Sequence, residues 1–94
     1  MVAFTSLSRL PGDVRLEVAK RERKRRKQLG ITQRELAEKS GVSLGSLRRF
    51  EQSGRISFES LVSICFALNC QDELDQLFAA PAYRSIQEVI DEAR

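Results

Sequence analysis

The chain has no histidine and no tryptophan among its 94 residues. Histidine is the commonest general base and a preferred zinc ligand, so its absence argues against both a catalytic centre and a zinc site. The serines have no candidate base beside them, and no Gly-rich loop of the kind that holds a nucleotide phosphate occurs. We therefore expect a protein that is not an enzyme and that uses no cofactor or metal.

Cysteines and long apolar runs are also scarce. Cys65 and Cys70 are too few for a disulfide framework. We expect them near the end of one apolar helix, on different faces, as buried thiols that act as small hydrophobic side chains. No stretch approaches the roughly 18 consecutive apolar residues of a membrane span, and residues 1–7 do not form a signal peptide. The sequence thus predicts a cytoplasmic protein.

Charge is divided unevenly along the chain. Residues 1–55 carry fourteen Lys and Arg against six Asp and Glu, whereas residues 56–94 carry two against seven. The first part is therefore net +8 and the second net −5. A basic half favours a polyanion partner, although a charge run is also typical of a solvated surface. An acidic half suits an outward face, a dimer contact or a protein partner.

Helical spacing of the apolar residues predicts an all-α domain, because no alternating strand pattern occurs. Ninety-four residues allow one domain with a modest core. We expect helices over 10–29, 32–40, 43–51, 57–69 and 72–78, and a short amphipathic helix from 85 to the end. The inward positions of the first helix are expected to be Val14, Val18, Ala19 and Leu29. In the helix over 72–78, Leu74, Leu77 and Phe78 are expected to be buried.

Residues 32–52 form the most informative segment. Thr32 and Glu35 fit a capping box at the start of one helix, and Gly41 supplies the positive φ of a sharp turn. Ser43 then caps a second helix. The inward side chains of the two helices are Leu36, Ala37, Leu47 and Phe50. This spacing predicts a helix-turn-helix whose second helix enters the DNA major groove.

The motif also resembles a known family. The segments that carry the resemblance are 29–33, 35–37, 40–43 and 50–51, and they are similar to the Cro/C1-type (XRE) regulators, which include phage repressors. The likeness spans about residues 19–78. It implies a five-helix, lambda-repressor-like DNA-binding domain over 13–79, between an N-terminal arm at 1–12 and a tail with a short helix at 80–94. It also implies a homodimer that binds a pseudo-palindromic double-stranded operator.

A narrower likeness concerns segments 43–51, 56–61, 72–78 and 81–86. These are similar to HipB-like antitoxins, small regulators encoded beside Hip-type kinase toxins. This likeness implies an alternative role, in which the chain binds and neutralises a protein toxin. The residues expected to form the dimer or partner contact are Leu74, Leu77, Phe78, Tyr83, Ile86 and Ile90.

The second helix of the motif is expected to read bases. The candidates are Ser43, Leu44, Gly45, Arg48 and Arg49. Arg49 matches the family position that reads bases from mid-helix, where an arginine can bond guanine O6 and N7. Leu44 can contact a thymine methyl group, and Gly45 permits close backbone approach. Alternatively, these two contribute nothing, and specificity comes from Arg48, Arg49 and DNA shape.

Phosphate contacts are expected at the start of the motif and beyond its end. The matching family position of Gln33 bonds phosphate, helped by the positive helix terminus. The further candidates are Thr32, Arg34, Ser46 and Arg55. In the alternative interpretation, Arg34 and Arg55 are only solvated surface charges.

Two positions of the first helix bear on stability. The resemblance implies an ion pair between Arg26 and Glu51, which would tie the first helix to the end of the recognition helix. Glu22 departs from the family, which usually has an aliphatic residue there. A charged group is costly to bury, so we expect either a local rotation or extension of the helix, or a pair with Arg25 or Arg26 at the rim.

Overall fold

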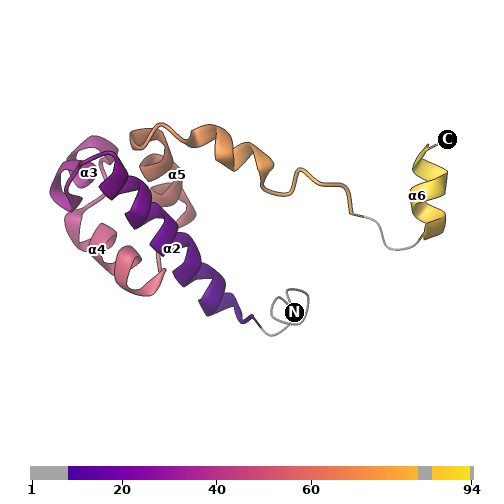
Figure 1. The fold of residues 1–94 in the computed structure, drawn as a ribbon, viewed down its shortest axis with the longest axis horizontal. Helices are drawn as coiled ribbons and strands as arrows, with labels where there is room; N and C mark the ends of the chain where they lie inside the picture. The colour runs from indigo at the N-terminus through magenta and orange to yellow at the C-terminus, as the bar shows by residue number, and fades with distance from the viewer. Residues whose placement is uncertain (1–8, 83–85, 94) are drawn as a thin grey trace.

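The structure is a computed structural model that describes residues 9–82 and 86–93. These residues contain helices and connecting segments, with no strand, which confirms the all-α prediction (Figure 1). The elements are α2 (Pro11–Gln28), α3 (Gln33–Ser40), α4 (Leu44–Ser53), α5 (Phe58–Ala67), the 3-10 helix η1 (Gln71–Gln76) and α6 (Ile86–Ala93). None of these helices is both long and apolar enough to span a membrane.

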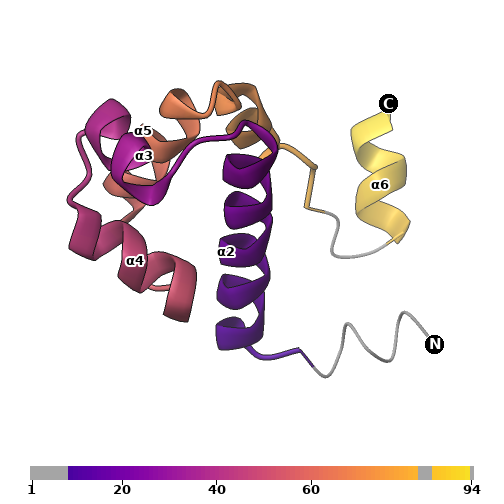
Figure 2. The same ribbon diagram turned by 60° about the vertical axis from the view of Figure 1, so that its left-hand side comes forward.

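The helices α2 to α5 enclose one small core. Helix α2 packs on α4, α3 packs on both α4 and α5, and η1 packs on α5. Figure 2 shows α2 standing beside α4, with α3 and α5 above, and α6 apart from them. The buried apolar side chains are Ala19, Leu36, Ala37, Val42, Leu47, Phe50, Ile64 and Leu68.

Local chemistry at the helix ends follows the sequence closely. The Glu35 backbone N–H donates to the Thr32 hydroxyl and the Thr32 N–H donates to the Glu35 carboxylate, each at 3.0 Å, which confirms the capping box. Gly41 ends α3 with φ +76°. Ser43 and Ser57 cap α4 and α5, and each hydroxyl accepts the backbone N–H three residues on at 3.1 Å. These caps fix where α3, α4 and α5 begin.

Gly54 has a structural role that the sequence did not reveal. It is buried, ends α4 with φ +77°, and lies against the α2 backbone. A Cβ atom placed on it would lie 2.6 Å from the carbonyl carbon of Arg15. The end of the second motif helix is therefore fixed by direct backbone contact with α2.

Helix α2 presents a more polar inner face than predicted. Of its expected apolar positions, only Ala19 is buried, while Val14 and Leu29 are 39% and 52% exposed. Glu22 and Arg26 are buried instead. The attachment of α2 therefore depends on polar contacts as well as on apolar area.

The predicted fifth α-helix over 72–78 is wrong. A 3-10 helix over Gln71–Gln76 takes its place, and the chain is extended at Leu77. Leu74 is partly buried, but Leu77 is 53% exposed and Phe78 is fully exposed, with φ +59°. These side chains were expected inside because they are apolar. Leu77 and Phe78 lie after η1, and neither is buried against another part of the described chain.

The two cysteines lie on different elements. Cys65 belongs to α5, whereas Cys70 follows a reversal of the chain at Asn69, which has φ +57°. The Cys70 N–H donates to the Cys65 carbonyl at 2.9 Å. Both thiols are only partly buried. Burial raises the pKa of Cys65 to about 11, and the adjacent Cys70 thiol acts in the same direction. The placement of both cysteines on one helix is therefore wrong.

Candidate nucleic-acid interface

Helix α4 has one anchored face and one open face. Leu47 and Phe50 are fully buried and attach the helix to the core. The outward positions Ser43, Gly45, Arg48 and Arg49 are exposed, as the sequence predicts for residues that meet a ligand. Leu44 differs, because it is partly buried and packs against the core. Its side chain is therefore less available for a base contact than the other four positions.

The two arginines of α4 are uncommitted within the domain. No hydrogen bond or ion pair to another described residue occupies the guanidinium group of Arg48 or Arg49. A Cβ atom on Gly45 would meet nothing within 4 Å, so the helix surface beside the arginines is open. This face offers positive charge and room for a close approach.

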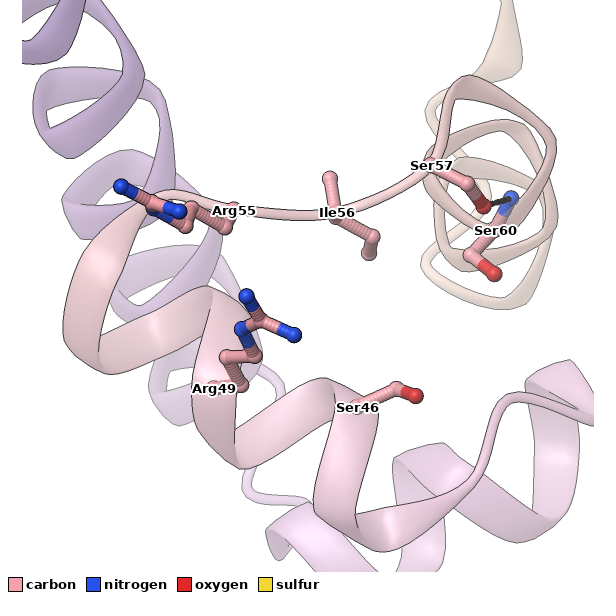
Figure 3. A pocket seen from close by; sticks show the side chains of 6 residues that line it. All are labelled: Ser46, Arg49, Arg55, Ile56, Ser57 and Ser60. Atoms are coloured by element: carbon pink, nitrogen blue, oxygen red, sulfur yellow. Dashed lines mark hydrogen bonds between the residues drawn. The ribbon is translucent and has the colours of Figure 1, made fainter.

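A cleft of about 340 Å³ lies between α4 and the start of α5. Figure 3 shows the Arg49 guanidinium directed into the cleft from α4, with the Arg55–Ser57 segment on the opposite side. The lining residues are Ser46, Arg49, Arg55, Ile56, Ser57 and Ser60. The Arg49 guanidinium and three serine hydroxyls, with Arg55 at the edge, make this cleft suited to an anion with several acceptor oxygens.

Sequence reasoning assigned Ser46, Arg49 and Arg55 to the interface, but it missed Ile56, Ser57 and Ser60. The signal was present, since Ser57 caps a helix that begins three residues after the basic Arg55. The first backbone N–H groups of a helix carry partial positive charge and bind anions. The structure adds what the sequence did not show, which is that this helix end faces α4 across the cleft.

The start of α3 forms a second polar surface. The Thr32 hydroxyl and backbone N–H are both engaged in the capping box with Glu35. The Gln33 amide donates one hydrogen bond to Glu51 at 3.0 Å and has a second N–H left for a ligand. Arg34 is exposed. The hydrogen bond to Glu51 therefore orients the Gln33 side chain and leaves one amide hydrogen available.

The ion pair expected between Arg26 and Glu51 is formed. Arg26 Nε donates to Glu51 Oε2 at 2.9 Å and Nη2 donates to Oε1 at 2.8 Å, while Nη1 donates to the Ile31 carbonyl at 3.1 Å. The two side chains are 9% and 3% exposed. Because the pair is bidentate and shielded from solvent, it ties α2 to α4 and to the turn before α3.

The comparison with protein families agrees with this geometry. A helix-turn-helix family model of the Cro/C1 (XRE) type matches residues 23–73, which is more than half of the chain. The chain belongs to the Cro/C1-type helix-turn-helix family. No curated protein and no solved structure matches it significantly. The matched residues include all of α3, α4 and α5, and with them the cleft. A Cro/C1-type domain supports the role of a DNA-binding regulator.

Glu22 breaks the expectation drawn from the Cro/C1-type pattern. It is neither rotated to the surface nor paired with an arginine, because it is 8% exposed and neither carboxyl oxygen has a hydrogen-bond partner as an acceptor. Burial raises the pKa of Glu22 to about 8, and Glu51 raises it further through a hydrogen bond and its charge, against the opposite effect of Arg26. Burial and the neighbouring Glu51 therefore both favour the neutral acid over the carboxylate at this position.

The residues predicted for a dimer or partner contact are mostly exposed in this Cro/C1-type chain. Besides Leu77 and Phe78, Ile86 is 81% exposed and Ile90 is 44% exposed. Leu74 is partly buried, and Tyr83 lies outside the described residues. Exposed apolar side chains on the segment after η1 and on α6 suit protein contacts.

Proposed function

We propose that this cytoplasmic protein is a sequence-specific transcriptional repressor that places α4 in the major groove of an operator. The cleft beside α4 is the observation that carries the proposal. It combines the uncommitted Arg49 with Arg55 and a helix N-terminus on the open side of a helix whose other side is fully anchored. Arg48 and Arg49 read base edges, Ser43 and Gly45 allow close approach, and Leu44 contributes least.

Phosphate contacts are proposed on both sides of the groove-facing helix. At the start of α3, Gln33 offers its second amide hydrogen, with Arg34 and Thr32 beside it. At the cleft, Ser46 and Arg55 bind the sugar–phosphate backbone together with the α5 N-terminus. Such contacts position the protein, while base contacts specify the sequence.

The first experiment titrates the protein with DNA from its own promoter, with scrambled competitor, at two salt concentrations. We expect Arg49→Ala to lose about 1–3 kcal/mol of operator affinity and to reduce the preference for the operator over scrambled DNA. Arg34→Ala is a matched change at an exposed arginine of α3. It should weaken binding to the operator and to scrambled DNA alike, and lower the slope of log affinity against log salt concentration by about 1. An Arg49→Ala protein that keeps its full preference would rule out base reading by Arg49. A flat salt dependence would rule out the repressor itself.

A homodimer is the second part of the proposal, because a pseudo-palindromic operator is read by two symmetric copies. The exposed Leu77 and Phe78, with Ile86 and Ile90, provide apolar area for this contact. We expect Leu77→Asp to shift the protein from dimer to monomer in sedimentation experiments, since a carboxylate in an apolar interface is costly to desolvate. The control is Gln76→Asp, which adds the same charge at the adjacent exposed position.

The alternative function is that of an antitoxin that binds a Hip-type kinase toxin. It is favoured by the same apolar surface and by the likeness of segments 72–78 and 81–86. A Leu77→Asp protein that sediments like the wild type would weigh against the dimer contact at Leu77. The exposed residues would then fit a different protein partner, such as the toxin.

A further inference from the structure

Glu22 is a buried acidic residue that the proposed DNA contacts do not use. It projects from α2 into the interface with α4, beside the Arg26–Glu51 pair. As a carboxylate it would have no hydrogen-bond donor, because no described group donates to either oxygen. A buried ion without a partner is costly, so the geometry favours the neutral acid.

Glu51 is the neighbour that can accept a hydrogen bond from the protonated Glu22 carboxyl group. Glu51 of α4 is the acceptor within reach, and two carboxyl groups can bond only when one of them carries a proton. The charged groups that act on Glu22 are Glu51 and, from α2 itself, Arg26. From α3, the neutral amide of Gln33 reaches the same Glu51 carboxylate.

The two carboxyl groups are driven in opposite directions. Burial alone would raise the pKa of Glu51, but hydrogen bonds from Arg26, Glu22 and Gln33 outweigh it and hold that pKa below its ordinary value. Glu51 is thus the ion and Glu22 the acid of the pair. Arg26 from α2 and Gln33 from α3 both donate to this carboxylate, and the donor from α3 is a proposed phosphate ligand.

We propose that Glu22 is a neutral carboxylic acid that donates a hydrogen bond to Glu51, and that this bond helps to position Gln33 for DNA. Ionisation of Glu22 removes the donor and places a second negative charge beside Glu51, in competition for Arg26. The Glu51 carboxylate then no longer fixes Gln33 in the same place. The part of this proposal that concerns DNA rests on the proposed function, whereas the part that concerns the proton does not.

The sign of the pH effect follows from linkage. In the unfolded chain Glu22 releases its proton at an ordinary pKa near 4.5, whereas in the folded chain it does so at about 8. Between these values only the folded state holds the proton, so stability falls as pH rises, and above about pH 8 it levels off. The chain has no histidine, so no imidazole titrates in this interval.

The test compares urea unfolding of the wild type and Glu22→Gln from pH 5 to 9. Glutamine is a permanently neutral donor of similar size. We expect the unfolding constant of the wild type, divided by that of the variant, to rise by up to about tenfold per pH unit between 5 and 8 and then to level off. The control is Glu38→Gln, at an exposed position of α3. A pH-independent ratio for Glu22→Gln would overturn the proposal.

A second measurement covers the case in which Glu22→Gln does not fold. The side-chain carboxyl carbons of the wild-type glutamates are followed by NMR during a pH titration. One carboxyl group that titrates near pH 8 supports the proposal, and titration of every glutamate near the ordinary value of about 4.3 contradicts it.

Operator binding at pH 7 and pH 9.5, at fixed salt, tests the positioning of Gln33. Bound phosphates favour the neutral acid, so the wild type should lose about fivefold or more in affinity relative to Glu22→Gln over this range. If the operator affinities of the wild type and Glu22→Gln changed equally with pH, the proposed role of Glu22 in positioning Gln33 would be overturned. If neither protein binds DNA at any pH, the proposed function fails instead. The unfolding data still show whether Glu22 is protonated in the folded protein.

Discussion

Replacing Arg26 by methionine is expected to destabilise the domain by about 3–5 kcal/mol. The change leaves Glu51 buried without its bidentate partner and removes the cation that offsets two neighbouring carboxyl groups. Whole domains of this size are stable by only about 5–15 kcal/mol, so the variant should be close to unfolding at 37 °C. Urea denaturation followed by far-ultraviolet circular dichroism measures the loss.

The double variant Arg26→Met, Glu51→Leu distinguishes the loss of a pair from the loss of a side chain. It removes both charges, so it should be more stable than the single variant. Arg25→Met provides the matched control, because Arg25 pairs with Glu73 at the surface, where both side chains are well exposed. Little change is expected there. Equal or greater loss in the double variant would refute the account of Arg26 and Glu51 as a stabilising pair.

Replacing Gly54 by alanine is expected to cost about 2–5 kcal/mol. The left-handed backbone costs an L-residue about 1–2 kcal/mol, and overpacking adds about 1–3 kcal/mol. The added methyl group would lie 2.6 Å from backbone at Arg15, which cannot move without displacing α2. The measurement is again the midpoint and slope of urea unfolding.

Gly41 separates the two causes within the same chain. Its φ of +76° nearly equals that of Gly54, but a Cβ atom there would meet nothing within 4 Å. Gly41→Ala should therefore show only the backbone cost of about 1–2 kcal/mol. If the two alanine variants were equally stable, the close approach of α2 to Gly54 would contribute nothing.

Much of the fold could be predicted because its signals are local. The capping box at Thr32, the turn at Gly41 and the caps at Ser43 and Ser57 each depend on residues no more than four apart. Such features are set by backbone hydrogen bonding and need no knowledge of distant packing. They fix α3, α4 and the start of α5, and with them most of the candidate interface.

The sequence predictions were wrong where the surroundings of a residue are formed by residues far away in the sequence. Glu22 was expected at the surface because a carboxylate is costly to bury, but it is buried beside Glu51, where the neutral acid is favoured. Gly54 looked like an ordinary loop glycine because Arg15 is far away in the sequence. Phe78 was placed inside for its apolar character alone. Apolar character favours burial of a side chain, but it does not distinguish burial in the core of the domain from burial against another molecule.

The division of α4 into an anchored and an open face bears on how DNA preference can change over evolution. Leu47 and Phe50 hold the helix, while Gly45, Arg48 and Arg49 make no contact that the domain needs. Duplicated genes could therefore diverge at these three positions while each intermediate remains folded. Ser43 is less free, because its hydroxyl caps the helix and only a few residue types can replace it there.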